Sequence, residues 1–451
     1  MVDQLRDVVG PQVIVDQDVI ASYTTDWTRR FVGRTAAVVR PGSTEEVAGV
    51  VAVCRALGVA LVPQGGNTGL VGGGVPLHDE VVLSLRRLQS LERVDYLAGQ
   101  VTAGAGVSLS ALHIAAHAAG WAYGVDLASR DSATVGGMVA TNAGGTHVLR
   151  YGDTRSQVIG VEAVLGTGAV VSHLGGLVKD NTGYHLPGLV CGSEGTLAVV
   201  TAARLRLVPA LACRTVAVLA FTTVSDALDA STVFRRCLPS LEASELFLHA
   251  GLELVCSVTG MRPPFPGTHP AYLLVEAADQ ADPTDALADV THSVAAVSEV
   301  VVATDPGRRA ELWRYREAHT EAINTLGPPH KLDVTLPLGS LASFVDRVPG
   351  TVREMAPAAR TWLFGHAGDG NIHVNVSGLP PDDDRVDDRV LRLVGEFGGS
   401  ISAEHGVGSS KRKWLHISRT AAEISAFRTL KQALDPDGVL NPNVLLPTNR
   451  S

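Results

Sequence analysis

The chain has 451 residues, of which 45% are hydrophobic and 18% are charged, and its formal net charge at pH 7 is −9. This length exceeds the size at which a single hydrophobic core stops growing, so we expect two or three domains. The acidic balance argues against nucleic acid and anionic membrane surfaces as partners. An N-terminus without a signal pattern and five scattered cysteines without a C-x-x-C pair predict a cytoplasmic protein with reduced thiols.

The first predicted elements form a strand, helix and strand over residues 35–62. The apolar run AAVVRP ends at a Pro-Gly pair, Ser43 or Thr44 can cap the following helix, and Gly58 can close it. Short β-rich runs then alternate with glycine clusters as far as residue 208. Pro209 marks the expected boundary of an N-terminal domain.

Strands and helices alternate in the following segment, 209–380, which predicts an α+β domain. One long helix is predicted over residues 308–326, before a Gly-Pro-Pro break and the strand KLDVTLP. The remaining residues are predicted to be mainly helical. The acidic run PPDDDRVDD at 380–388 is predicted to be a solvated loop.

The glycine cluster PQGGNTGLVGGGVP at 63–76 follows a predicted strand and contains six glycines. Because glycine has no Cβ, backbone N–H groups in such a loop can approach an anion such as a pyrophosphate. A mobile surface loop is the alternative interpretation. Two further clusters, at 134–152 and 179–201, also lie beside predicted strands. Three such segments favour an extended dinucleotide, although no Rossmann glycine pattern opens a helix here.

Three segments resemble a known cofactor domain: PQGGNTG, then VDLASRDSATVGGMVATNAGG followed by RYGD, then KDNTGY followed by GSEGTL. Together they are similar to the FAD-binding domain of PCMH-type flavoproteins, the vanillyl-alcohol-oxidase superfamily. Within it they resemble the branch that contains D-2-hydroxyglutarate dehydrogenase, D-lactate dehydrogenase and the glycolate oxidase D subunit.

The resemblance implies an α+β fold with three parts. A PCMH-type FAD-binding domain of two α/β subdomains is expected over 1–208, and an α+β substrate-binding domain over 209–380. A helical C-terminal segment, 381–451, is expected to carry Glu404 and His405 and to pack back on the FAD-binding domain.

The resemblance also implies FAD, and we expect it to be bound non-covalently because no obvious tethering motif is present. The pyrophosphate is expected on Gly65, Gly66, Asn67, Thr68 and Gly69. Thr134, Gly137, Thr141, Asn142 and Gly145 are expected along the cofactor, with Gly195 and Val200 near the adenine. Pro63, Asp126 and Asn441 complete the implied cofactor site.

Two histidines flank an Asp-Gly turn in GHAGDGNIHVN, residues 365–375. The resemblance implies that His366 and His373 bind a divalent metal together with Glu404. Two imidazoles and one carboxylate with open positions are typical of a catalytic rather than a structural metal site. This donor set suits Zn²⁺ and also Mn²⁺ or Fe²⁺. The alternative is a pair of surface histidines beside a hairpin.

A metal at this position would bind the hydroxyl and carboxylate of a 2-hydroxy acid and orient its Cα–H toward the flavin. His405 is our candidate for the base that takes the hydroxyl proton. The alternative is that His405 only hydrogen-bonds the substrate or supports Glu404. Asn375 lies two residues after His373 on the same strand face, so it can contact the substrate or the flavin edge.

Arg316 and Thr320 are spaced to lie on one helix face, and Lys331 opens the next strand. An Arg fork and a Lys ammonium can hold a second carboxylate. This pattern resembles the 2-hydroxyglutarate enzymes, where the matching positions bind the distal carboxylate. The alternative is that Arg316 pairs with a surface carboxylate such as Glu317 or Glu321.

The predicted function is an FAD-dependent dehydrogenase that oxidises a D-2-hydroxy acid, foremost D-2-hydroxyglutarate, to the 2-oxo acid. Electrons would pass from the flavin to an electron-transfer flavoprotein or a quinone. A D-lactate or glycolate dehydrogenase, a zinc hydrolase without flavin, and a non-catalytic flavin-binding subunit are the alternatives. A malate- or hydroxyadipate-like substrate and a homodimer are left open.

Overall fold

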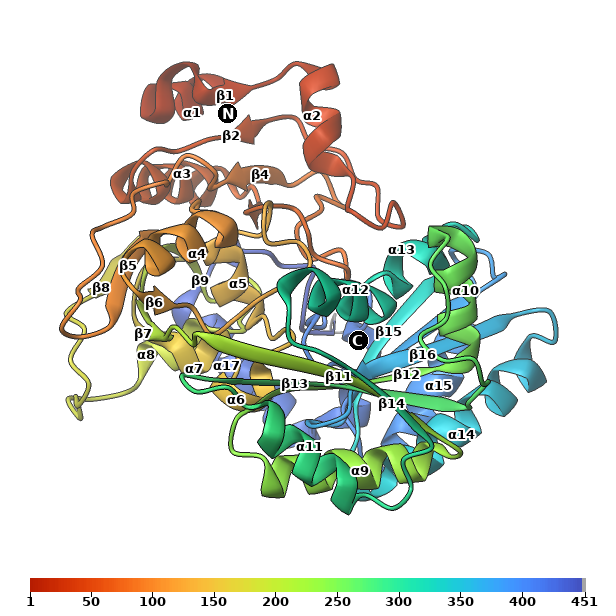
Figure 1. Ribbon diagram of the computed structural model, residues 1–451. Helices are drawn as coiled ribbons and strands as arrows, with labels where there is room; N and C mark the ends of the chain where they lie inside the picture. The colour runs from red at the N-terminus through yellow and green to blue at the C-terminus, as the bar shows by residue number, and fades with distance from the viewer. Residues whose placement is uncertain (448–451) are drawn as a thin grey trace. The chain divides into compact units, whose positions relative to one another are not determined.

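The computed structural model describes residues 1–447, which form two compact units (Figure 1). The first unit is built from Met1–Gly145, Tyr151–Ala210 and the segment that starts at Glu404. The second unit consists of Thr146–Arg150 and Leu211–Ala403. Within the described residues, no helix combines the length and the apolarity that a membrane crossing requires.

The first unit contains a four-stranded sheet in the order β1-β2-β4-β3. Its strands are β1 (Val13–Ile14), β2 (Val38–Val39), β3 (Leu61–Gln64) and β4 (Val81–Ser84). Helix α3 (Thr44–Leu57) begins after Ser43, whose Oγ accepts the amide of Glu46 at 3.2 Å, and ends at Gly58 with φ 63°. The predicted strand, helix and strand are therefore confirmed. Strands β2 and β3 are not neighbours, because β4 lies between them and runs parallel to both.

A second sheet of the first unit is antiparallel, in the order β5-β9-β7-β8. Its strands are β5 (Gln100–Gly104), β7 (Val158–Leu165), β8 (Val170–His173) and β9 (Ala198–Arg206). Helices α4 (Leu109–Ala118) and α5 (Val135–Thr141) share its buried apolar core. Strands β6 (Trp121–Ala122) and β10 (Val208–Pro209) form a separate antiparallel pair.

The C-terminal segment of the first unit extends the edge of the first sheet. Leu61 of β3 donates its amide to Val439 O, and its carbonyl accepts the amide of Asn441, each at 2.8 Å. Lys431, near the end of α17 (Ala421–Leu434), donates to Thr196 O at 2.8 Å. The shorter helices of the chain are α1 (Val2–Val9), α2 (Gln17–Thr24), α6 (Val148–Tyr151), α7 (Thr154–Gln157), α8 (Leu186–Val190) and α16 (Leu415–Ser418).

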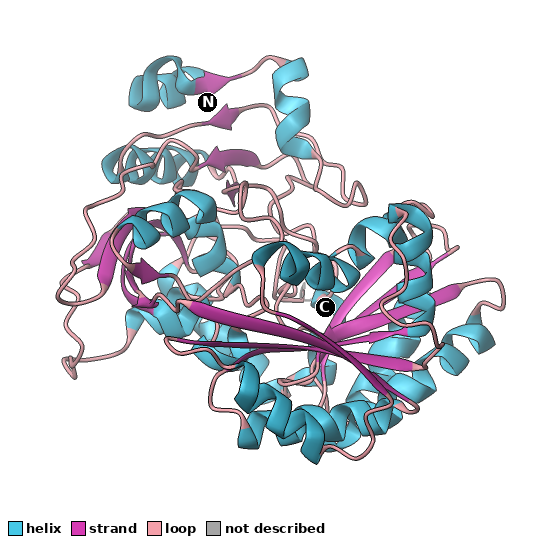
Figure 2. Cartoon of the chain, viewed as in Figure 1, coloured by secondary structure: helices cyan, strands magenta, loops and turns pink. Residues whose placement is uncertain are grey.

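The second unit is built on a seven-stranded antiparallel sheet in the order β14-β11-β13-β12-β16-β17-β15. The strands are β11 (Cys213–Phe221), β12 (Leu241–Leu248), β13 (Ala271–Asp279), β14 (Glu299–Ala303), β15 (His330–Thr335), β16 (Arg360–His366) and β17 (Asn371–Ser377). Strand β11 is buried along most of its length because helices cover both faces of the sheet (Figure 2).

Two groups of helices cover the two faces of this sheet. One group consists of α9 (Val224–Cys237), α11 (Thr284–Ser293), α14 (Leu338–Met355) and α15 (Arg385–Glu396). The other consists of α10 (His249–Thr259), α12 (Pro306–Glu317) and α13 (His319–Asn324). Neighbouring residues of β12 face opposite groups: Ser244 hydrogen-bonds Ser231 of α9, and Glu245 pairs with Arg316 of α12.

The predicted continuous helix over 308–326 is wrong, because the chain breaks at Ala318 into α12 and α13. Nδ1 of His319 bonds the carbonyl oxygen of Arg316 at 3.2 Å. In an unbroken α-helix this oxygen accepts the amide of residue 320. Arg316 therefore lies in the last turn of α12, and Thr320 lies on α13.

The acidic run at 380–388 is not a solvated loop throughout. Helix α15 begins at Arg385, and Asp387 on it is only 2% exposed. Oδ1 of Asp387 bonds Nδ1 of the buried His330 at 2.8 Å. The neighbouring Asp388 pairs instead with Arg392 and its side chain is 38% exposed.

We expect Asp387→Ala to lower the free energy of unfolding by about 3 kcal/mol, because it leaves a buried imidazole without its carboxylate. Asp388→Ala is the matched control, and it should cost less than about 1 kcal/mol because its ion pair is exposed. Chemical denaturation of both variants gives the comparison. Similar small losses in the two variants would contradict a structural role for the buried pair.

Candidate active site

Two glycine-bearing loops of the first unit approach each other so closely that no side chain fits between them. A Cβ on Gly66 would lie 1.9 Å from Ser132 O, and a Cβ on Gly65 would lie 2.2 Å from Oγ1 of Thr134. A Cβ on Gly145, which has φ +113°, would lie 2.0 Å from Asp126 O. These glycines are therefore needed for the contact between the loops. By contrast, a Cβ on Gly69 would meet nothing within 4 Å.

The other predicted cofactor positions lie on the same loops or on elements beside them. Gly195, with φ +70°, lies against Pro63 of β3, since a Cβ there would be 3.2 Å from Cγ of the proline. Thr134 caps α5, its Oγ1 accepting the amide of Gly137 at 3.4 Å, and Thr141 Oγ1 donates to Gly137 O at 3.0 Å. Thr68 lies in the loop after β3, and Val200 is buried on β9.

The three predicted asparagines use their amide groups to hold loops together. Asn67 donates to Thr25 O at 2.9 Å, and Asn142 donates to Oδ2 of Asp153 at 2.7 Å. Asn441 donates to the carbonyl oxygens of Gly73 and Glu194, both at 2.9 Å. All three asparagines have positive φ. Asn67 and Asn441 therefore hold the cofactor loops through main-chain oxygens, and Asn142 does so through a side-chain carboxylate.

In the second unit, one face of the sheet carries the predicted metal and substrate residues. Directly opposed residues of neighbouring strands project to the same face, and so do alternate residues of one strand. The register pairs His373 with Asp333 and Asn375 with Lys331, while His366 stands opposite the first residue of β17. The polar side chains on this face include Glu245, Lys331, Asp333, His366, Asn371, His373 and Asn375.

The structure brings the rings of His366 and His373 to a centroid distance of 5.5 Å. Nδ1 of His366 bonds Oε1 of Glu245 at 2.6 Å, and Nδ1 of His373 lies 3.5 Å from Oδ1 of Asp333. A carboxylate beside Nδ1 holds the proton on that nitrogen, so Nε2 presents its lone pair. Metal-binding histidines typically have such partners. Each of the two imidazoles therefore has the kind of carboxylate partner that metal-binding histidines have.

Asp333 is held by three groups of the second unit. Nδ2 of Asn371 donates to its Oδ1 at 2.8 Å, and the amide of Ala403 donates to its Oδ2 at 3.1 Å. His373 is the third group. Ala403, whose amide bonds Asp333, is the residue before the predicted metal ligand Glu404 in the sequence.

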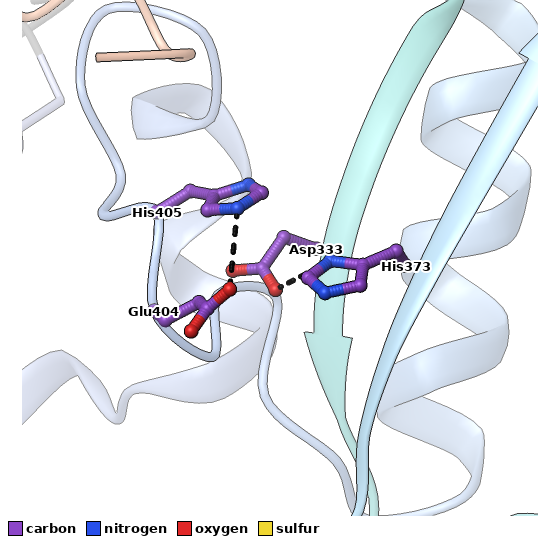
Figure 3. Close-up of side chains that lie close together, drawn as sticks. All are labelled: Asp333, His373, Glu404 and His405. Carbon is purple, nitrogen blue, oxygen red and sulfur yellow. Dashed lines mark ion pairs between the residues drawn. The ribbon is translucent and has the colours of Figure 1, made fainter. Parts of the chain in front are cut away.

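Glu404 and His405 begin the last segment of the first unit. Oε2 of Glu404 accepts the amide of Gly145 at 3.0 Å, and its Oε1 lies 3.5 Å from Nε2 of His405. Figure 3 shows this pair and the Asp333–His373 pair. Each of these two pairs supplies one imidazole and one carboxylate, which are donors that divalent metal ions accept.

Arg316 reaches the same sheet face from the end of α12. Its Nε lies 2.8 Å from Oε2 of Glu245, and its guanidinium lies 4.6 Å from the ring centroid of Phe364. The predicted alternative partners, Glu317 and Glu321, are therefore not its partners. His319 stacks on the same Phe364 ring at 4.9 Å. Burial lowers the pKa of His319 to about 3, so it adds no positive charge beside Arg316.

Lys331 and Asn375 lie opposite each other on β15 and β17, at the side of His373 away from the Asp-Gly turn. Burial lowers the pKa of Lys331 to about 8. The ammonium is therefore protonated at neutral pH but poorly solvated, which favours a carboxylate partner. Thr320 lies on α13 and is partly buried.

Both parts of the chain match models of known families. Residues 35–173 match an FAD binding domain, and residues 211–445 match the C-terminal domain of FAD linked oxidases. A D-2-hydroxyglutarate dehydrogenase from Xanthomonas citri pv. viticola is 39% identical over 95% of this chain and 92% of the relative. A mitochondrial D-2-hydroxyglutarate dehydrogenase from Bos taurus is 36% identical over 99% of this chain and 83% of the relative.

This chain belongs to the FAD-linked oxidase family. It is an FAD-dependent oxidoreductase, as the resemblance predicted. The solved structure of p-cresol methylhydroxylase with substrate bound matches all of this chain and 97% of its own at a TM-score of 0.79 and 16% identity. A 4-ethylphenol oxidase from Gulosibacter chungangensis matches 100% of this chain and 97% of its own, at a TM-score of 0.77 and 17% sequence identity. These likenesses confirm the predicted PCMH-type fold.

Three residues that contact the predicted site of this FAD-linked oxidase were missed by the sequence analysis. Arg86 donates to Gly65 O at 3.2 Å and to Gly66 O at 3.0 Å, and so holds the glycine loop. Glu245 and Asp333 hold the two imidazoles. A signal for Glu245 and Asp333 was present, because each is an acidic residue within a mostly buried strand, LEASELFL and HKLDVT.

We expect Gly66→Ala to lower the melting temperature of the FAD-linked oxidase by about 5 °C and to reduce its FAD content. The added Cβ must displace a backbone carbonyl, and overpacking of this kind costs about 1–3 kcal/mol. Gly69→Ala is the matched control in the same loop and should melt within about 1 °C of the parent. Thermal unfolding of the apoproteins and flavin absorbance measure the two effects. Equal melting temperatures would contradict the close contact of the loops.

Proposed function

We propose that this FAD-linked oxidase converts D-2-hydroxyglutarate to the corresponding 2-oxo acid. The main support for the proposal is that the His366–His373 pair and two cationic side chains lie at the same face of the sheet. The cationic side chains are Lys331 of β15 and Arg316 of α12. A 2-hydroxy acid needs only one site for its hydroxyl and carboxylate. A second cationic site on the same face suits a second carboxylate. The names of the similar dehydrogenases support this substrate.

Arg316 can bind a carboxylate even though it already pairs with Glu245. That pair engages Nε, and the two terminal nitrogens of the guanidinium fork can make a bidentate contact. Lys331 adds a second positive charge to this face of the sheet. Thr320 would donate its hydroxyl to the same group.

His366, His373 and Glu404 would hold a divalent metal ion, which would act as a Lewis acid on the substrate hydroxyl and carboxylate. Zn²⁺ suits these donors, and Mn²⁺ or Fe²⁺ would also fit. The carboxylates of Glu245 and Asp333 support this proposal, because each lies at the Nδ1 atom of one imidazole. Their negative charge also raises the basicity of the two rings as ligands.

FAD, when bound, supplies the acceptor for the hydride that leaves the substrate Cα. His405 would take the hydroxyl proton, so that the hydroxyl becomes the carbonyl of the 2-oxo acid. Asn375, on the strand face shared with Lys331, would hydrogen-bond the substrate. We further propose an electron-transfer flavoprotein or a quinone as the electron acceptor. The name of a relative from Saccharomyces cerevisiae, D-2-hydroxyglutarate–pyruvate transhydrogenase, makes pyruvate an acceptor worth testing as well.

Anaerobic reduction of the bound flavin by a panel of hydroxy acids tests the proposed function. The second-order rate constant of flavin reduction by D-2-hydroxyglutarate should be at least tenfold higher than the rate constants for D-lactate, glycolate and L-2-hydroxyglutarate. A chelator should abolish the bleaching, and added Zn²⁺ or Mn²⁺ should restore it. Equal or faster reduction by D-lactate would refute the dicarboxylate substrate, and no reduction by any hydroxy acid would refute the enzyme function.

The charge of Lys331 predicts a pH dependence that is specific to the dicarboxylate. Because its pKa is lowered to about 8 by burial, the ammonium is lost as the pH rises through 8. The ratio of kcat/KM for D-2-hydroxyglutarate to that for D-lactate should therefore fall, by up to tenfold per pH unit above about 8. Lys331→Arg stays charged and should keep the ratio constant to pH 10. A falling ratio in both proteins would remove Lys331 from the proposed site.

A further inference from the structure

Glu245 is a buried carboxylate in the middle of the second unit's sheet. Its side chain is 1% exposed, and its neighbours on β12 include Leu246 and Phe247, both buried. Oε1 bonds Nδ1 of His366 at 2.6 Å, and Oε2 lies 2.8 Å from Nε of Arg316. Oε1 is therefore hydrogen-bonded to a residue of the proposed metal site. Oε2 forms an ion pair, without hydrogen-bond geometry, with a residue of the proposed carboxylate site.

Both partners sit on elements that leave Glu245 little freedom. His366 ends β16 and stands directly opposite Glu245 in the register of the sheet. Arg316 lies in the last turn of α12, and its guanidinium also rests on Phe364 of β16 at 4.6 Å. The ring of Phe364 in turn lies 5.1 Å from that of His373. One carboxylate and one aromatic ring thus join the two proposed subsites.

Stability alone does not explain this arrangement. A buried ion pair contributes little net stability, because the loss of hydration of both charges offsets their attraction. The arrangement does place two groups: Oε1 of Glu245 bonds the imidazole of His366 through Nδ1, and Oε2 keeps the guanidinium of Arg316 beside it. Fixed orientations of this kind are what a binding site requires.

We infer that Glu245 is a positioning residue that sets the separation between the metal-binding imidazole of His366 and the carboxylate-binding guanidinium of Arg316. It thereby selects 2-hydroxy dicarboxylates by chain length. The inference rests on the proposed function and extends it to a residue that touches neither the substrate nor the metal. Substrates one methylene shorter or longer would fit one subsite but not both.

Two substitutions separate the roles of Glu245. Glu245→Asp keeps the charge but shortens the side chain by one methylene, so that it cannot hold both partners. We expect its preference for D-2-hydroxyglutarate over malate and 2-hydroxyadipate, measured as the ratio of kcat/KM values, to fall at least tenfold. Turnover of D-lactate, which uses only the metal subsite, should fall by a smaller factor than turnover of D-2-hydroxyglutarate. Glu245→Gln keeps the length but removes the negative charge beside His366, and we expect it to weaken Zn²⁺ binding about 10- to 100-fold.

Zn²⁺ affinity is measured on the metal-free protein by competition with a coloured chelator, and it does not depend on turnover. Glu242→Gln is the matched control, because Glu242 is a buried residue of the same strand that also pairs with an arginine, Arg214. It should leave the chain-length preference unchanged. It is not the control for Zn²⁺ affinity, because Glu242 lies with His147 and Glu276 in a second group of possible metal ligands. Thermal unfolding of all variants checks that each one is folded.

The inference is overturned if Glu245→Asp loses activity by the same factor on every substrate, or if Glu245→Gln binds Zn²⁺ as the parent does. If the parent protein oxidises no member of the series, the proposed function and the chain-length selection both fail. The Zn²⁺ titration then still decides whether Glu245 positions His366, since it needs no substrate.

Discussion

The chemistry of the second unit depends on the two-residue period of an antiparallel sheet. Because alternate residues project to one face, His366, His373, Asn375 and Lys331 can share a surface although they come from three strands. A register shift of one residue in β15 or β17 would turn Lys331 or His373 into the opposite helix layer. The backbone pairing therefore determines which side chains can meet.

Charges buried within this sheet are compensated locally. Glu245 has Arg316 and His366, Asp333 has an amide and two side chains, and Glu242 has Arg214. Each carboxylate is held in one orientation by partners on both sides. These interactions compensate the charge of each buried carboxylate. They also orient the imidazoles and the guanidinium, so that a substitution of one carboxylate should affect both stability and the geometry of the site.

The first unit uses backbone contacts where the second uses side chains. Its glycines allow loops to touch, and two of its asparagines with positive φ, Asn67 and Asn441, donate to backbone carbonyl groups. Glu194 extends this pattern to the C-terminal segment, where it accepts the amides of Val407 at 2.8 Å and Gly408 at 2.7 Å. Burial raises the pKa of Glu194, and these two amides oppose that shift. The loop that follows Glu404 and His405 is anchored in this way.

Local patterns in the sequence were enough to locate the strand, helix and strand over 35–62 and the strand that carries His373. Capping residues, glycines and alternation are short-range signals, and so were the motifs that indicated the flavoprotein family and the PCMH-type fold. Ala318 and Asp387 lie where these short-range signals gave a wrong prediction. The helix breaks at Ala318, where His319 Nδ1 bonds Arg316 O, and Asp387 is buried against His330, which is 57 residues away in the sequence. Likewise, only the pairing of β12 with β16 revealed that Glu245 connects His366 to Arg316. Sequence alone determined which residue types were available, while strand register and burial decided their partners, because contacts between distant residues depend on the packed chain.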